Sequence, residues 1–118
     1  MKLKDLVTYV RTLPYIVEDI KWGNDRVFSI AGGKMFCVFS FENDEYIGVS
    51  FKVDDHRFLE ITDRPQFVPA PYMARARWVY LVDTNGISEK ELKELISRSH
   101  QLYFEKLSRK AQRSLLET

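Results

Sequence analysis

Cysteine and long apolar runs are scarce in this sequence, and each shortage excludes a class of protein. Cys37 is the only cysteine among 118 residues, so no disulfide can form within the chain and a reducing compartment is favoured. The longest apolar run, "MFCVFSF" at 35–41, is far shorter than the ~20 residues that cross a bilayer. The first residues mix acidic and basic side chains with apolar ones, unlike a secretion signal. We therefore expect a cytoplasmic protein that makes no membrane contact.

A strong net charge is also missing. The formal net charge is +1, so no global field draws the protein toward nucleic acid or anionic membranes. The charges are nevertheless unevenly distributed. Residues 42–63 hold seven acidic and two basic side chains, whereas residues 97–118 hold five basic and two acidic ones. The carboxyl-terminal part is therefore the basic end of the chain.

Catalytic signatures are absent as well. The sequence has no cysteine pair, HExxH motif, phosphate-binding glycine loop or nucleophile elbow. His56 stands beside Asp54 and Asp55, a grouping that suits a metal or an oriented imidazole, but equally the acidic start of a helix. Cys37 falls within an apolar strand, where its thiol is expected to be buried and inert. We expect no enzyme, no cofactor and no metal site.

What the sequence does contain is typical of a folded domain. Hydrophobic residues make up 45% of it and charged residues 30%, as in ordinary globular proteins. A chain of this length buries roughly two-thirds of its unfolded surface in a single core and leaves no room for a second domain. Residues 1–118 are therefore predicted to form one domain, with a monomer as the default state.

The first half of the sequence predicts a helix followed by three strands. Apolar residues recur at helical spacing from Leu3 to Leu13, and Pro14 disfavours helical geometry at the residue before it. Residues 15–24 are interpreted as a connection. Three segments rich in β-branched and aromatic residues follow, at 26–30, 34–41 and 46–52. Gly32-Gly33 and Asn43-Asp44 provide turn residues between them, which indicates an antiparallel meander.

The middle predicted strand is apolar on both faces. Alternation with a period of two places Met35 and Cys37 on one face and Phe36 and Val38 on the other. We therefore expect other parts of the protein to cover both faces near the centre of the strand.

A short helix and an extended ribbon are predicted next. Asp54 or Asp55 is suited to cap a helix that ends near Thr62. Pro69 and Pro71 exclude a helix, and residues 74–82 are predicted to continue the extended path as a strand.

Two further helices complete the prediction. Ser88 and Glu91 form a capping box at the start of a helix of about five turns, and a shorter helix is expected to begin near Ser108. The predicted fold class is α+β with an antiparallel sheet and the element order α-β-β-β-α-β(-β)-α-α.

Arg75 and Arg77 are the first candidate binding residues. On the predicted strand they alternate with Trp78 and Tyr80, so that the guanidinium groups share one face and the aromatic rings the other. A guanidinium binds phosphate through two parallel hydrogen bonds. In the alternative interpretation both arginines pair with acidic residues of 42–63. Trp78 is expected to anchor the core rather than to stack on a base.

A basic stripe is the second candidate. Lys106, Lys110 and Arg113 recur at helical spacing, with Arg109 nearby, if a helix continues through Ser108. Such a stripe is suited to follow a phosphate backbone, although a solvated amphipathic terminus gives the same pattern.

Lys34 in a hairpin turn and Lys52 at a strand end are both expected to be exposed. Turn lysines more often serve solubility than binding.

Several stretches together resemble the MmcQ/YjbR family of small bacterial proteins across nearly the whole chain. They are, in order, a first helix that ends in "LP", an acidic loop before "WGND", "VFSIAGGKMFCVF", "SFKVDD", "PAPYMARARWV" and "LISRSHQLYFEKLSRKAQ". The resemblance implies an α+β fold similar to secretion-chaperone and frataxin-like arrangements, also described as a double wing. It also implies a DNA-binding role.

The matching family positions are Trp22, Gly23, Lys34, Lys52 and Trp78. The chain departs from the family in one place, because many relatives carry a histidine, an asparagine and a basic residue before the tryptophan. Here Tyr72, Ala74, Arg75, Ala76 and Arg77 occupy that stretch.

The function predicted from these observations is weak, non-catalytic binding to the phosphate backbone of DNA. The predicted contact residues are Lys34, Lys52, Arg75, Arg77, Lys106, Arg109, Lys110 and Arg113. The first alternative is a protein-interaction module that uses the sheet face or an exposed hairpin edge. The second is a metal-binding or enzymatic domain that draws on the carboxylates of 42–63.

Overall fold

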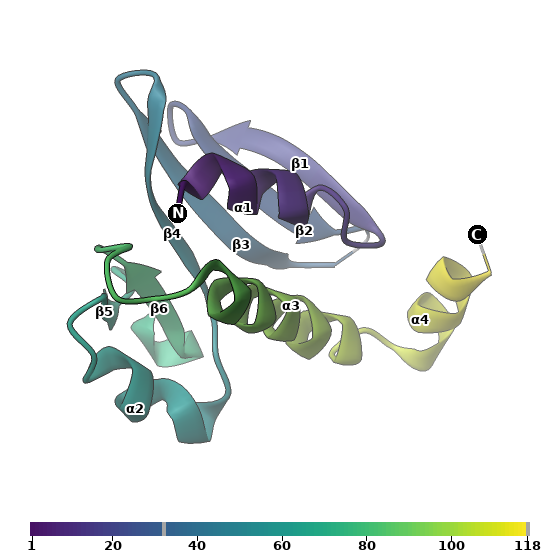
Figure 1. The fold of residues 1–118 in the computed structure, drawn as a ribbon. Coiled ribbons are helices and arrows are strands. Elements are labelled where there is room, and N and C mark those ends of the chain that lie inside the picture. Colours follow the sequence, from purple (N-terminus) through teal and green to yellow (C-terminus); the bar gives the residue numbers. More distant parts are fainter. Residues whose placement is uncertain (32, 118) are drawn as a thin grey trace.

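The computed structural model describes residues 1–31 and 33–117 and contains an antiparallel sheet with α-helices around it (Figure 1). The elements are α1 (Leu3–Val10), β1 (Ile16–Lys21), β2 (Asp25–Ile30), β3 (Met35–Glu42), β4 (Glu45–Lys52), the 3-10 helix η1 (Asp55–Arg57), α2 (Phe58–Thr62), β5 (Phe67–Pro69), the 3-10 helix η2 (Ala74–Ala76), β6 (Trp78–Leu81), α3 (Glu89–Glu105) and α4 (Arg109–Leu116). The predicted α+β class with an antiparallel sheet is confirmed.

The sheet is ordered β1-β2-β3-β4-β6-β5, and every neighbouring pair is antiparallel. β2, β3 and β4 form the predicted meander. Asn43 and Asp44, between β3 and β4, have φ angles of 52° and 62°, as a type I′ turn requires. Gly32 of the other predicted turn lies outside the described residues. Turn chemistry thus fixes the β3–β4 hairpin locally.

β1 corrects the interpretation of residues 15–24 as a connection. This strand pairs with β2 from Ile16 opposite Ile30 to Lys21 opposite Asp25. Only Ile16 is half-buried, and the other residues of β1 are exposed. A strand at the sheet edge that is exposed on both faces has no alternating apolar pattern, so its sequence carries no strand signal.

The segment before β6 also departs from the prediction. Residues 74–76 form η2 instead of a strand, and Arg77 follows with a φ of 64° in the left-handed region. The amide of Trp78 donates to the carbonyl oxygen of Met73 at 3.2 Å, which closes the turn. Since the strand begins only at Trp78, Arg75 and Arg77 do not alternate along a strand face.

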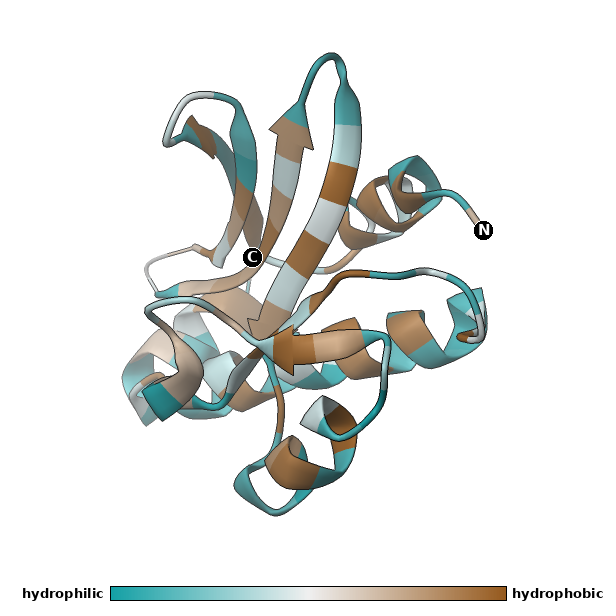
Figure 2. Ribbon diagram, turned by 90° about the vertical axis from the view of Figure 1, so that its left-hand side faces the viewer, coloured by the Kyte–Doolittle hydropathy of each residue, from teal (hydrophilic) through white to brown (hydrophobic). Residues whose placement is uncertain are grey.

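α3 packs on β3 and β4, and α1 packs on α3 and β4, so the two helices cover the same side of the sheet (Figure 1). Hydrophobic and more polar residues alternate along β4 (Figure 2). The hydroxyl of Ser99 on α3 accepts from the amide of Lys52 at 3.0 Å and donates to the carbonyl oxygen of Phe36 at 2.7 Å. The largest fully buried side chains include Trp78, Phe28, Phe36, Phe39, Phe51 and Leu6.

Both carboxyl-terminal helices begin at serine caps. Ser88 Oγ accepts from the amide of Glu91 at 3.0 Å, and Ser108 Oγ accepts from the amide of Ala111 at 3.1 Å. The capping box at Ser88 is only half formed, because the Glu91 carboxylate binds the Arg64 guanidinium at 2.7 and 3.1 Å. A charged partner from a distant loop thus replaces the local backbone amide.

Neither Asp54 nor Asp55 caps the following helix, which corrects that prediction. The Asp54 carboxylate instead accepts two hydrogen bonds from the Arg98 guanidinium, at 2.9 and 3.0 Å. These hydrogen bonds lower the pKa of Asp54. The pair ties the loop after β4 to α3.

Replacing Asp54 with asparagine is expected to lower the free energy of unfolding by about 1 kcal/mol at pH 7, because the lost pair is bidentate but partly exposed. The contribution is complete above the unfolded pKa of about 3.9 and is lost as the pH falls through the lower folded pKa. Urea titrations at neutral and acidic pH measure this loss. An Asp63→Asn control should change little at either pH, and a pH-independent deficit in Asp54→Asn would contradict the assignment.

None of the helices formed by residues 1–31 and 33–117 combines the length and apolar character needed to span a bilayer.

Candidate functional site

Six of the eight predicted cations lie in two places. Lys52, Arg75 and Arg77 lie around the end of β4 and the turn that precedes β6. Arg109, Lys110 and Arg113 lie on α4, which extends beyond the end of α3 (Figure 1). Lys106, the C-cap residue that follows α3, stands between the two groups, and Lys34 belongs to the β2–β3 hairpin.

Lys52 is buried, which corrects the expectation for a lysine at a strand end. The residue is only 8% exposed, and its Nζ donates to the carbonyl oxygen of Ala76 at 2.5 Å. Burial is the main cause that lowers the pKa of Lys52, and the nearby positive charges of Lys106 and Arg77 act in the same direction. We call Lys52, Arg77 and Lys106 the β4-end cations.

Arg77 has partners, whereas Arg75 has none among the described residues. The Arg77 guanidinium lies 3.8 Å from an Asp55 carboxylate oxygen and 5.5 Å from the centre of the Phe58 ring. The pairing of an arginine with the acidic segment 42–63 therefore holds for Arg77. It does not hold for Arg75, which is exposed in η2.

The basic stripe predicted for a continuous helix is interrupted. α3 ends at Glu105, and Ser108 caps a separate helix that begins at Arg109. Lys106 therefore lies in the turn between the helices, with its Nζ 5.1 Å from the centre of the Tyr103 ring. Lys110 and Arg113 still share one face of α4, because they are three residues apart.

The β2–β3 hairpin lies against the turn between α3 and α4. A β-carbon added to Gly33 would be 3.0 Å from Cδ2 of Leu107. This contact places the exposed Lys34 close to the start of α4. We call Lys34, Lys106, Arg109, Lys110 and Arg113 the α4-end cations.

The α4-end cations form no ion pairs within residues 1–31 and 33–117. Most arginines elsewhere in that part of the chain have a carboxylate partner: Arg11, Arg57, Arg64, Arg77 and Arg98. Between residues 106 and 117 the only acidic residue is Glu117, against four basic ones. The α4 end therefore keeps an unneutralised positive charge.

A cavity of 740 Å³ lies on the sheet face opposite α1 and α3. Val38, Ser40 and Ser50 of the central strands line it, together with Trp78 and Tyr80 of β6. Trp22, from the turn between β1 and β2, and Tyr72, from the segment between β5 and η2, also line it. We call this the open-face cavity.

The two aromatic residues from these loops are exposed and conformationally strained. Trp22 is 65% exposed and Tyr72 is fully exposed, at 104%. Both have positive φ angles, 51° for Trp22 and 66° for Tyr72. Bulky residues rarely adopt this left-handed region, and it persists only where the surrounding structure holds it. The fold therefore holds two large rings in solvent at a cavity.

The arrangement of the cavity floor depends on two local features. The Tyr80 ring lies so close to Gly48 that a β-carbon on Gly48 would be 2.1 Å from the Tyr80 hydroxyl oxygen. A β-bulge opposite Phe28 and Ser29 shifts the register of β3, so that Met35 lines the cavity together with Val38. This corrects the simple alternation, which placed Met35 on the face of Cys37.

Trp78 anchors the core, as predicted. The residue is 1% exposed, and its indole Nε1 donates to the Tyr103 hydroxyl at 2.8 Å. Burial raises the pKa of Tyr103. Trp78 also pairs with Lys52 across β4 and β6 and lines the open-face cavity. It therefore connects the cavity to the β4-end cations.

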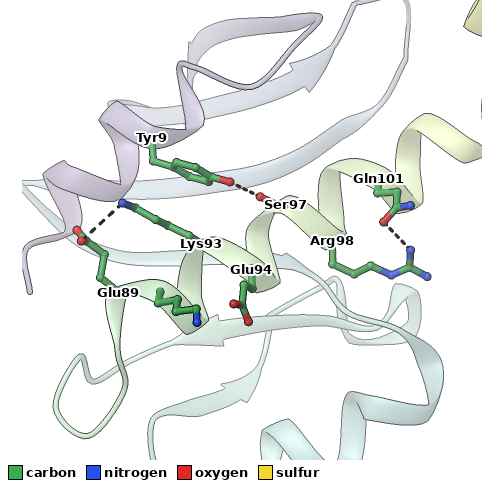
Figure 3. Close-up of a pocket in the computed structure, with 8 residues that line it drawn as sticks. Tyr9, Glu89, Lys93, Glu94, Ser97, Arg98 and Gln101 are labelled. Atoms are coloured by element: carbon green, nitrogen blue, oxygen red, sulfur yellow. Dashed lines mark hydrogen bonds and ion pairs between the residues drawn. The ribbon is translucent and has the colours of Figure 1, made fainter.

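Another cavity, of 620 Å³, follows the contact between α1 and α3 (Figure 3). The Tyr9 hydroxyl bonds Ser97 Oγ at 2.5 Å, and Lys93 pairs with Glu89 at 3.6 Å. The Lys93 Nζ also lies 5.3 Å from the centre of the Tyr9 ring. Most of the polar groups around this cavity already bind one another, which is typical of a helix-packing contact.

The candidate metal and nucleophilic residues are dispersed. No three His, Cys, Asp or Glu side chains within residues 1–31 and 33–117 are placed to share a metal ion. His56 is exposed, and Asp54 is bound to Arg98. Cys37 is fully buried, and burial raises the pKa of its thiol well above the usual value, as expected for an inert cysteine.

Together these features define a small α+β protein with an exposed aromatic cavity on one sheet face and an unpaired basic group at one end. The sequence model of the YjbR family matches residues 11–102, and the chain belongs to this family. The family resemblance of the sequence is thereby confirmed.

Two crystal structures share the fold. A Deinococcus radiodurans protein, DR2400, described with a DUF419 domain, aligns with a TM-score of 0.83 and 22% identity, over 97% of this chain and 87% of that one. A protein from Pseudomonas syringae aligns with a TM-score of 0.70 and 19% identity, over 87% of this chain and 99% of that one. No curated protein is significantly similar in sequence.

Proposed function

We propose that this YjbR protein binds DNA weakly and without base specificity, through phosphate contacts made by the α4-end cations. The observation that carries the proposal is the lack of ion pairs at this end, among the described residues of a protein where five other arginines have carboxylate partners. Unpaired arginine and lysine side chains release counterions from DNA when they contact phosphates, which favours binding.

The geometry supports contact with the backbone rather than with bases. α4 spans only Arg109–Leu116, and three of its eight residues are basic. Base readout needs a helix that places amide or guanidinium groups against base edges in the major groove, whereas a short basic helix beside a lysine hairpin suits phosphates. Affinity in the micromolar range or weaker is expected at physiological salt.

Replacing Arg109, Lys110 and Arg113 together with glutamine should weaken duplex binding and flatten its salt dependence. Five phosphate contacts give a slope of log K against log salt concentration of about −4.5, and losing three reduces its magnitude by about 2.7. Fluorescence anisotropy with a labelled duplex, titrated from low to moderate salt, measures both quantities.

The matched control removes the same charge elsewhere, at Lys2, Lys4 and Lys90, which are exposed and form no ion pairs within the described part of the chain. This control should keep most of the salt slope. Equal losses in both triple variants, or no duplex binding at about 50 mM salt, would contradict the proposal.

The outer edge of β1 favours protein interaction as a second candidate function. β1 is the last strand of the sheet, so its outer backbone groups have no strand partner among residues 1–31 and 33–117. Val17 and Ile20 are 43% and 60% exposed on this strand. An extended peptide can add to such an edge by backbone hydrogen bonds. Retention of a lysate protein that a proline at Ile20 abolishes would support this function.

A further inference from the structure

The rim of the open-face cavity has the features of a stacking site. Trp22 and Tyr72 come from loops fifty positions apart in sequence, yet both line the same cavity. Each exposes a large ring at a backbone conformation that favours glycine. A flat aromatic ligand would cover apolar surface that now faces water, and stacking on tryptophan or tyrosine is a common way to hold an unpaired base.

The floor of the cavity offers polar groups that suit a base edge. The hydroxyls of Ser40 and Ser50 line the cavity and form no hydrogen bond within the described residues. The Asp25 carboxylate also lines it and accepts one hydrogen bond, from the amide of Phe41 at 3.3 Å. A carboxylate accepts hydrogen bonds from an exocyclic amino group, such as that of cytosine.

The positive charge next to Trp78, one of the residues that line the cavity, suits a phosphate. Trp78 lines the cavity and pairs with Lys52, and Lys52 interacts electrostatically with Arg77 and Lys106. Asp55 opposes Arg77, at 3.8 Å, and Asp54 is occupied by Arg98. The three β4-end cations therefore face a single available carboxylate, that of Asp55. A volume of 740 Å³ is within the range of small-molecule sites.

We propose that the open-face cavity binds a nucleobase that carries a phosphate, with the base between Trp22 and Tyr72 and the phosphate at the β4-end cations. This inference adds base contacts to the proposed function. It rests on that function only where nucleic acid is taken as the source of the ligand. An unpaired base in single-stranded nucleic acid and a free nucleotide share the chemistry that the cavity recognises.

The test uses the full chain with deoxycytidine monophosphate, a short labelled oligo(dC) strand and a duplex of the same length. Isothermal titration calorimetry follows the nucleotide, and anisotropy follows the strands. Trp22→Ala and Tyr72→Ala should each weaken single-strand binding about 5-fold to 150-fold, the usual loss for one stacking ring. Oligo(dT) should bind more weakly than oligo(dC), because thymine has no exocyclic amino group for Asp25.

Two further variants separate binding from folding. Leu59→Ala removes a side chain that is 79% exposed but lies on α2 outside the cavity, and it should leave binding unchanged. Trp22→Gly should raise the melting temperature, since glycine adopts the left-handed region freely, while it weakens binding as strongly as Trp22→Ala. If the Trp22 ring served only to pack against the protein, its removal would instead lower the melting temperature.

The outcomes distinguish this inference from the proposed function. Tighter binding of the strand than of the nucleotide assigns the cavity to single-stranded nucleic acid, and equal binding assigns it to a free nucleotide. Ring variants that leave both affinities unchanged overturn the inference, even if the α4 triple variant still weakens duplex binding. A protein retained from a lysate through Trp22, with no nucleotide or strand bound, also overturns it. Nucleotide binding without duplex binding supports the inference and contradicts the proposed function.

Discussion

Replacing Ser99 with alanine is expected to lower the free energy of unfolding by about 2–4 kcal/mol. The hydroxyl satisfies two backbone groups at once, the amide of Lys52 and the carbonyl oxygen of Phe36. Ser99 and Phe36 are fully buried, so water cannot replace the lost partner without entering the core. Each unsatisfied buried group costs about 1–3 kcal/mol.

The position of Ser99 explains why the effect should be large. The register of β3 and β4 begins at Cys37 opposite Phe51, and the next residues of the two strands, Phe36 and Lys52, are not paired with each other. The hydroxyl lies where the next inter-strand hydrogen bond would be, and it joins α3 to both strands. Loss of this contact should therefore loosen the helix from the sheet as well as the strands from each other.

Urea denaturation of the wild-type and Ser99→Ala proteins measures the effect. Ser97→Ala is the matched control on the same helix, because it removes one half-buried hydrogen bond, to Tyr9. The control should cost at most about 1 kcal/mol. Equal losses of unfolding free energy in the two variants would show that the two hydrogen bonds of Ser99 to the strands contribute no more than the single bond of Ser97.

Replacing Gly48 with alanine is expected to destabilise the protein by about 1–3 kcal/mol, the usual cost of overpacking. The new β-carbon would lie 2.1 Å from the Tyr80 hydroxyl oxygen, 2.4 Å from Cζ and 2.7 Å from Cε1. The ring must therefore move away from the sheet. Since Tyr80 lines the open-face cavity, the substitution should also weaken any ligand held there.

A double-mutant cycle isolates the contact between Gly48 and Tyr80. With Tyr80 replaced by alanine, Gly48→Ala should become neutral or stabilise the strand by about 0.5 kcal/mol, because alanine loses less backbone entropy than glycine. Gly23→Ala is the control, since Gly23 has a φ of 92° but a β-carbon there would meet no described atom within 4 Å. Its cost should be the same in both backgrounds, and a cost of Gly48→Ala that is independent of Tyr80 would contradict the steric explanation.

The elements that can be predicted are those whose signal is local. Asn43 and Asp44 specify a turn because both residue types tolerate positive φ. Ser88 and Ser108 specify helix starts because each side chain accepts a hydrogen bond from the amide three residues later. β1 cannot be predicted in this way, because its residues face solvent and only pairing with β2 makes it a strand.

The sequence predicts the candidate site less well than the fold. A strand end suggests an exposed Lys52, although α3 and the turn after Ala76 bury this residue. The position of Asp54 before a helix suggests a cap, although Arg98 of α3 binds its carboxylate. In both cases a partner more than twenty positions away decides the environment, and no spacing within the sequence indicates it.

The sequence by itself determined the α+β class, the β2–β4 meander, the buried Trp78 and the basic carboxyl-terminal end, since each depends on residue types and periodicities within one segment. Only the tertiary structure decided that the α4-end cations lack carboxylate partners among the described residues and that Trp22 and Tyr72 flank one cavity. The physical reason is the pairing of β6 with β4. This pairing places the segment around residue 72 at the same cavity as the β1–β2 turn. Contacts between such distant segments depend on strand order and packing, which no local pattern encodes.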